Sequence, residues 1–259
     1  MRLKRVAVAT PLLALLLATT ADQASAATFS VSPIRVELDA LHHTSILTVN
    51  NSGHEILRMQ VRPMHWAMAP DGEWNLSPSD DLIATPELLE VAPGDTMQLR
   101  IGSLEDPGTT EASYRLLINE LPNLNEDAGP HKPIVKVLTQ ISLPVYLEPA
   151  QPKRDPVLRS AAIENGTLRV GIGNEGTQRL DAQGARVILT DSAGHQIAQR
   201  DQTTNYVLAG STDFLRMKLP ASLCAKAASV TLAWPGMAGV SLTHPISRGS
   251  DPCGGAGLH

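Results

Sequence analysis

The sequence predicts an all-β protein made of two similar β-sandwich domains. Short segments alternate apolar and polar residues with a period of two, as in Ile34–Leu38, and this period is typical of half-buried strands. Clusters of Gly, Pro, Asn and Asp separate these segments, as in a β-sandwich. No long window shows the 3.6-residue period of an amphipathic helix. The chain also repeats itself weakly, which indicates two copies of one strand arrangement.

The strand pattern is clearest in the first half of the chain. Its segments are Ile34–Leu38, Ile46–Val49, Met59–Trp66, Leu99–Ile101, Tyr114–Leu121 and Ile134–Leu147. The second of these segments runs into Asn50–Gly53, whose composition predicts a turn.

Two pairs of segments carry the internal repeat. Leu47–Gly53 is echoed by Val170–Gly176, and both segments run from a strand into an Asn-x-Gly turn. Ala92–Arg100 is echoed by Leu208–Arg216, and both place a Gly turn before a strand that carries arginine. Two copies of one strand order predict two domains of one type.

The stretch Glu148–Pro156 holds three prolines and is typical of a short, stiff linker. We therefore expect an N-terminal domain over residues 27–149, a linker at 150–156 and a C-terminal domain over 157–259. Each domain has about 100–120 residues, the size of an immunoglobulin-like sandwich.

The first 26 residues read as a secretory signal peptide. Arg2, Lys4 and Arg5 precede the apolar run Val6–Ala18, and Ala24–Ala26 supplies a small-residue cleavage pattern. The alternative is an uncleaved anchor, but the apolar run is short for a membrane span. We expect cleavage after Ala26 and a mature protein without membrane insertion.

The two cysteines, Cys224 and Cys253, are expected to form a disulfide after export to an oxidising compartment. The bond would close a loop of about 30 residues, which the chain-entropy model values at roughly 3–4 kcal/mol. Two free thiols are the alternative.

The sequence gives no support for an enzyme, a metal site or a cofactor. No nucleophile elbow, HExxH motif or P-loop occurs. Gly171-x-Gly173-x-x-Gly176 matches a dinucleotide fingerprint by letter, but Thr177–Leu189 lacks the helical period that this motif requires. The formal net charge of -5 argues against nucleic-acid binding, because no basic excess exists to neutralise phosphates.

Four segments resemble the periplasmic pilus (fimbrial) chaperones of chaperone–usher systems. They are Phe29–Val36, with the first strand and its arginine, Leu82–Gly94, Tyr114–Pro122 and Ile141–Pro149. They cover most of residues 29–149 in the family's order and look more like the divergent, archaic or alternative members.

This resemblance implies an L-shaped pair of immunoglobulin-like domains in the periplasm. It implies that the protein caps pilin subunits by lending its G strand, a donor-strand complementation, and passes them to an outer-membrane usher. Binding of this kind is β-strand addition, in which backbone hydrogen bonds give affinity and alternate side chains fill a groove. Self-association through the exposed donor strand is also expected.

The donor strand is expected at Pro133–Val145. Its candidate residues are Ile134, Val135, Val137, Leu138, Thr139 and Ile141. By parity, Val135 and Val137 share one face and Ile134 and Leu138 the other, and the sequence leaves open which face enters the groove. An ordinary core strand is the alternative.

The resemblance also implies that Arg35 anchors the pilin's C-terminal carboxylate, because a guanidinium can bond a carboxylate bidentately. Better-known members carry a lysine as second anchor at the position that Ser142 occupies here. Lys136 and Arg100 are weaker candidates for the second cation. The competing hypothesis is a secreted two-domain structural or adhesion module, which would need neither Arg35 nor an exposed apolar strand.

Overall fold

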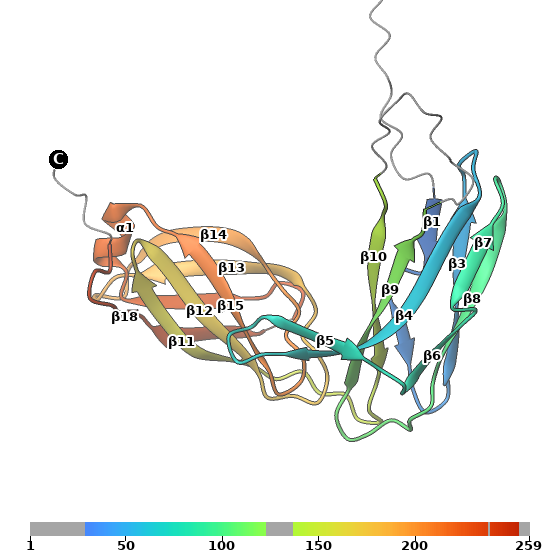
Figure 1. The fold of residues 1–259 in the computed structure, drawn as a ribbon. Helices are drawn as coiled ribbons and strands as arrows, with labels where there is room; N and C mark the ends of the chain where they lie inside the picture. The colour runs from blue at the N-terminus through green and yellow to red at the C-terminus, as the bar shows by residue number, and fades with distance from the viewer. Residues whose placement is uncertain (1–28, 123–136, 238, 254–259) are drawn as a thin grey trace, which may run out of the picture.

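Two β-sandwiches set at an angle and joined at one end make up the protein (Figure 1). The computed structural model describes residues 29–122, 137–237 and 239–253. Within these ranges every element except one short helix is a strand, which confirms the predicted all-β fold.

The N-terminal sandwich packs two sheets around one apolar core. The first sheet is antiparallel, in the order β1–β3–β8–β6. Its strands span Phe29–Ser32, Thr44–Asn51, Thr96–Ser103 and Leu82–Thr85. The second sheet has the order β2–β10–β9–β4–β5, and β7 also pairs with β4. Its strands span Val36–Leu38, Gln140–Leu147, Ala112–Glu120, Leu57–Met68, Trp74–Pro78 and Leu88–Val91.

The C-terminal sandwich is built in the same way around its own core. One sheet has the order β15–β12–β11–β18, with strands at Thr212–Lys218, Thr167–Asn174, Pro156–Glu164 and Ser247–Arg248. The other has the order β14–β13–β16–β17, with strands at Gln196–Thr204, Gln183–Thr190, Ser229–Ala233 and Ser241–Pro245. The helix α1 spans Ala221–Lys226.

The apolar residues that recur at every second position of the sequence are buried on one face of each strand. In β8, for example, Leu99 and Ile101 are fully buried, whereas Arg100 between them is exposed. Successive side chains of a strand point to opposite faces, so this alternation places apolar residues in the core and charged residues in water.

The internal repeat is a repeated corner between two strands. Each of the buried residues Asn51 and Asn174 donates from Nδ2 to two backbone carbonyls and accepts on Oδ1 from the glycine amide two residues later. The partners are Glu55, Val91 and Gly53 for Asn51, and Gln178, Val207 and Gly176 for Asn174. One buried polar side chain therefore satisfies three backbone groups in each domain.

The second repeated segment completes the same corner. The amide of Gly94 donates to the carbonyl of Asn51, and the amide of Gly210 donates to that of Asn174. These two glycines have φ values of +77° and +70°, a region that glycine enters without steric cost. Both repeats thus mark one structural device that occurs once per domain.

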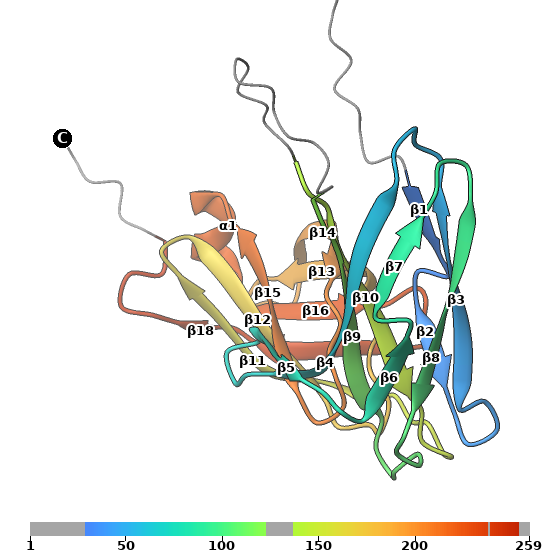
Figure 2. The same cartoon turned by 45° about the vertical axis from the view of Figure 1, so that its right-hand side comes forward.

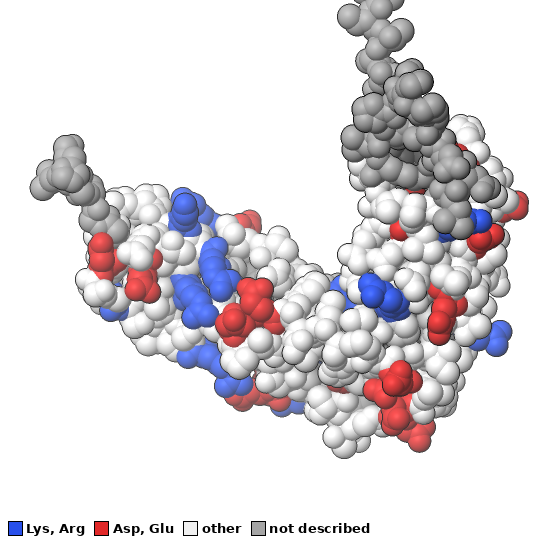
Figure 3. Space-filling view, in the orientation of Figure 1, with Lys and Arg blue, Asp and Glu red and all other residues white. Residues whose placement is uncertain are grey.

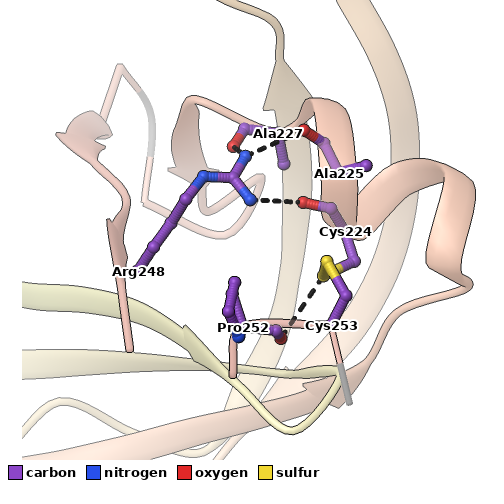
Figure 4. Close-up of a disulfide and its surroundings, with 6 residues drawn as sticks. All are labelled: Cys224, Ala225, Ala227, Arg248, Pro252 and Cys253. Carbon is purple, nitrogen blue, oxygen red and sulfur yellow. Dashed lines mark hydrogen bonds between the residues drawn. A yellow bond between two sulfur atoms is a disulfide. The ribbon is translucent and has the colours of Figure 1, made fainter. Parts of the chain in front are cut away.

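The chain end of the C-terminal domain is held by a disulfide and an arginine (Figure 4). Cys224 of α1 is bonded to Cys253, as predicted. Arg248 donates to the carbonyls of Cys224, Ala225 and Ala227 at 3.0, 3.1 and 2.9 Å. These are carbonyls that a helix end leaves without an internal partner, so one guanidinium closes the end of α1.

The hairpin of β4 and β5 reaches from the N-terminal domain to the C-terminal one (Figures 1 and 2). Gly72 in its turn lies against Asp213 and Phe214 of β15, where an added Cβ would come within 3.0 Å of Asp213 Oδ1. Its φ of +90° and this close approach both favour glycine. The hairpin is one of the contacts that fix the angle between the domains.

Candidate functional site

The strand β10 forms the margin of the N-terminal domain that faces the C-terminal domain (Figure 1). On one side it pairs with β9 along its whole length. On the other side it pairs with β2 only at Val145–Leu147, in parallel. Within the residues that the structure describes, Gln140–Pro144 therefore has no strand partner on this second edge. Pro144 suits such an edge, because proline is tolerated mainly at edge strands.

Burial along β10 changes from one end to the other. Leu143, Val145 and Leu147 belong to the core, and Ile141 packs partly against it. The residues before the strand are open to solvent, since Val137 is 83% exposed and Leu138 45%. Side chains are therefore buried at the end of β10 and become exposed toward its start and in the residues before it.

The described strand begins at Gln140, whereas the sequence places the donor strand at Pro133–Val145. The reason lies in the neighbouring strand: β9 ends at Glu120, whose side chain and amide bond to Thr139. No described strand continues beyond this point to pair with Val137. Of the candidate donor residues, Ile134 and Val135 lie outside the described residues, and so does Lys136, a candidate for the second cation.

Arg35 lies where the chain passes from one sheet of the N-terminal sandwich to the other. β1 pairs with β3 in the first sheet and β2 pairs with β10 in the second, with Arg35 in the connection. The register of β2 with β10 starts at Val36 opposite Val145, one residue past Arg35. Arg35 therefore stands at the point where the free edge of β10 ends.

The Arg35 side chain is bound by two carboxylates. Nη1 donates to Asp181 Oδ1 of the C-terminal domain at 3.2 Å, and Nε lies 3.2 Å from Glu37 Oε1. Asp181 also accepts from Arg154 Nη2 through its other oxygen, at 3.2 Å, and from Arg179 Nε at 3.2 Å. Three guanidinium groups from distant segments converge on one carboxylate.

Arg179 is the buried centre of this cluster, with a side chain only 1% exposed. It forms ion pairs with Glu37, Glu111 and Glu148 of the N-terminal domain in addition to Asp181, and it stacks on the Tyr146 ring at 3.6 Å. Burial by itself lowers the pKa of Arg179, but the carboxylates, Glu111 above all, raise it above its ordinary value. This residue ties the two domains together.

Glu111 is the most deeply buried carboxyl of the cluster. Burial raises its pKa to about 7, although the attraction of Arg179 works in the opposite direction. Its backbone amide also donates to Thr177 of the C-terminal domain. The joint between the domains therefore contains a carboxyl that titrates close to neutral pH.

A second buried cation, Arg115, is held in a different way. Its guanidinium lies 3.9 Å from the Trp66 ring centre and 4.3 Å from that of Trp74, next to Tyr206 of the C-terminal domain. Among the described residues its Nε and Nη2 have no hydrogen-bond partner, and burial lowers its pKa. Contacts with aromatic faces hold this arginine in place, and its burial keeps it from a ligand in solution.

Positive charge elsewhere gathers on the C-terminal domain over β11, β12 and β15 (Figure 3). Arg169 of β12 and Arg216 of β15 are direct neighbours there, and both are exposed. Neither forms an ion pair with a described carboxylate, so these arginines differ from those of the Asp181 cluster.

A family model matches residues 28–153, which include the whole N-terminal sandwich. This model describes the N-terminal domain of PapD-type pili and flagellar-assembly chaperones. Residues 28–153 therefore belong to this family of chaperone N-terminal domains. A comparison with curated proteins gave no match.

Solved structures share the fold of this chain over both domains. The CsuC–CsuE chaperone–tip adhesion subunit complex, from the archaic chaperone–usher Csu pili of Acinetobacter baumannii, matches with 19% identity and a TM-score of 0.56, covering 86% of this chain and 100% of that one. The class 5 fimbriae chaperone CfaA matches with 14% identity and a TM-score of 0.55, covering 84% and 98%. The SafB chaperone, in complex with the SafA pilin of Salmonella enterica, matches with 17% identity and a TM-score of 0.52, covering 80% and 89%.

The structure separates the anchor residues that the sequence suggests. Ser142 is exposed on β10, on the face opposite the core. Arg100 lies on β8 in the other sheet, where its register neighbours are Ile46 and Thr85. No described interaction joins either residue to Arg35.

Sequence reasoning missed Asp181, which accepts a hydrogen bond from Arg35, and Arg154, which donates to the same carboxylate. Arg154 lies in the stretch expected to be the linker, and Asp181 follows the second Asn-x-Gly turn. The only signal for Arg154 was a basic residue among the linker prolines.

Two further findings concern other kinds of site. Across residues 29–122, 137–237 and 239–253, no group of three His, Cys, Asp or Glu side chains could hold a metal ion. No helix in the same ranges is long and apolar enough to cross a membrane.

Proposed function

We propose that this protein is a periplasmic chaperone that binds pilin subunits through the free edge of β10 and delivers them to an outer-membrane usher. The observation that carries the proposal is the Gln140–Pro144 edge, which lacks a strand partner among the described residues. An unpaired edge is a template for another strand. Related complexes support it: the CsuC chain is paired with a tip adhesion subunit, and SafB is bound to a pilin.

The binding mode is donor-strand complementation. A pilin strand that adds to β10 gains backbone hydrogen bonds, and the exposed side chains of Val137 and Leu138 become available to an apolar groove. Burial of apolar surface contributes about 25 cal/mol per Å², so a few such side chains give several kcal/mol. The capture needs no catalysis and no cofactor.

The geometry of β2 supports Arg35 as the anchor of the pilin's C-terminal carboxylate. β2 occupies the β10 edge from Val145 onward, so an added strand has to stop before Val36. A strand running parallel to β10 would place its C-terminus at Arg35. A guanidinium binds such a terminal carboxylate with two hydrogen bonds.

The same free edge predicts two further properties. In the absence of pilin, an apolar edge is expected to associate with a second copy of the chain, which gel filtration would detect as a dimer. The N-terminal 26 residues, outside the described structure, are proposed to direct export and to be removed.

The test combines two variants with the pilins encoded in the same genome, co-expressed and purified with the tagged chaperone. Arg35→Ala is expected to abolish pilin capture, because losing one partner of a desolvated charge pair costs about 2–5 kcal/mol. It should leave the melting temperature almost unchanged, since half-exposed ion pairs contribute about 0–1 kcal/mol. Arg35→Lys should restore capture only in part.

Each outcome has a clear meaning. If the wild-type protein captures no pilin, the proposed function is wrong and a structural or adhesion module becomes the better hypothesis. If the Ala variant captures as much pilin as the wild type, Arg35 is not the anchor.

A further inference from the structure

Asp181 occupies a position that a ligand carboxylate could take. Its Oδ1 accepts from Arg35 Nη1, and its Oδ2 accepts from Arg154 Nη2, each at 3.2 Å. Two guanidinium groups from separate segments thus bind the two oxygens of one carboxylate. This arrangement shows that the pair can hold a carboxylate jointly.

The exposed fractions separate these two arginines from the third one. The side chains of Arg35 and Arg154 are 41% and 42% exposed, whereas that of Arg179 is 1% exposed. Arg179 also keeps three other carboxylate partners, Glu37, Glu111 and Glu148. Arg35 and Arg154 are therefore within reach of a ligand, and Arg179 is a structural centre.

We propose that Arg35 and Arg154 form a two-arginine clamp for the pilin's C-terminal carboxylate, and that Asp181 holds the clamp until pilin displaces it. This inference rests on the proposed function. The clamp supplies a second cation, which β10 lacks, since Ser142 stands at the position where better-known members of the resembling family carry a lysine.

The exchange conserves the ion pairs. An incoming carboxylate replaces one carboxylate by another on Arg35 and Arg154, while Asp181 keeps Arg179 as a partner. Removing one partner of a charge pair is costly when it leaves a buried charge without a partner. No buried charge is left in this way at any stage of the exchange. Asp181 therefore competes with pilin and lowers its apparent affinity.

The experiment is a competition between two purified, differently tagged chaperones for a limiting amount of one purified pilin that the wild type captures. Asp181→Asn and Arg154→Gln each compete against the wild type until the ratio of captured pilin is constant. Asp201→Asn and Arg169→Gln are the matched controls, because both residues are exposed and lie on the C-terminal domain away from the cluster.

Asp181→Asn is expected to out-compete the wild type about tenfold and Arg154→Gln to be out-competed about tenfold, the size of one charge-assisted hydrogen bond. The controls should share the pilin evenly. A second pilin, lengthened by one C-terminal glycine to displace its carboxylate, should reduce both effects. A purely structural role for Asp181 would not respond to this change.

The outcomes distinguish the inference from the proposed function. If the wild type captures pilin but the two variants share it evenly with the wild type, the clamp is wrong and the chaperone function stands. The same holds if Asp181→Asn binds more weakly, or if the extra glycine has no influence. If the wild type captures no pilin, both proposals fail.

Discussion

The strands β10 and β17 lie at the margins of the two domains, and their outer edges differ. β10 pairs with β9 on one side, and the other edge at Gln140–Pro144 has no partner in the described structure, next to the exposed Val137 and Leu138. β17 pairs with β16, carries Ser241, Thr243 and Pro245 on its exposed positions, and is followed by Ile246, which is partly buried against the core.

The difference shows which edge is free to bind. Both strands expose polar residues and carry a proline, so the difference lies in what adjoins each edge. Beyond β17 the chain crosses to β18, and the disulfide ties Cys253 to α1, so this end of the domain is closed. The N-terminal domain instead leaves an apolar segment at its margin, and the interaction surface is therefore expected there.

Opening the closed end should give the largest effect. The double variant Cys224→Ala, Cys253→Ala is expected to lower the free energy of unfolding of the C-terminal domain by about 3–4 kcal/mol, the chain-entropy value for a loop of this size. Pilin capture by the folded protein should persist, because the free edge lies in the other domain. Denaturant unfolding and co-purification on the same variant provide the measurement.

Peptide mapping of the non-reduced protein supplies the control for this variant. It should show Cys224 and Cys253 in one linked peptide. Two alkylatable thiols in exported wild-type protein would contradict the disulfide.

A matched pair of substitutions tests the free edge itself. Val145→Thr places a hydroxyl in the core and is expected to cost about 1–3 kcal/mol of stability. Val137→Thr, at an exposed position of the same parity, should change stability by less than about 0.5 kcal/mol. Pilin capture should show the reverse order. Val137→Thr should reduce capture more than Val145→Thr does, because the proposal places Val137 in the pilin groove.

Both variants retain the β-branched side chain, so strand propensity is not what differs. Melting temperature and pilin capture should be recorded for each. Strong destabilisation by Val137→Thr together with normal capture would refute the assignment of this segment.

The ion-pair cluster between the two domains, which contains Glu111, gives the smallest expected effect. The pKa of Glu111 is raised from 4.5 to about 7 by burial, so the folded protein binds this proton more tightly than the unfolded chain does. Its contribution to stability is complete below pH 4.5 and is lost as the pH rises through about 7. Relative to Glu111→Gln, the wild type should therefore lose about 1 kcal/mol between pH 6 and pH 7.5.

Denaturant unfolding at several pH values measures this difference, with the exposed Glu164→Gln as control. A wild-type curve parallel to that of Glu111→Gln would show that Glu111 stays ionised throughout. The angle between the domains would then rest on a fully charged cluster.

The sequence alone predicted the elements whose causes are local. The period of two placed Leu99 and Ile101 inside and Arg100 outside, because successive side chains of a strand alternate between faces. The repeated Asn-x-Gly turns marked Asn51 and Asn174, since one asparagine side chain can satisfy a whole corner by itself. The even cysteine pair predicted its own disulfide.

Only the tertiary structure decided which strand edge is free and which charges meet. Whether β10 has a neighbour depends on where β9 ends and β2 begins, and these strands lie far from it in sequence. The cluster around Asp181 joins arginines at positions 35, 154 and 179, each an ordinary charged residue in its own segment. Charges act through space, over distances of a few ångströms, so a sequence pattern records their presence and the fold alone determines their partners.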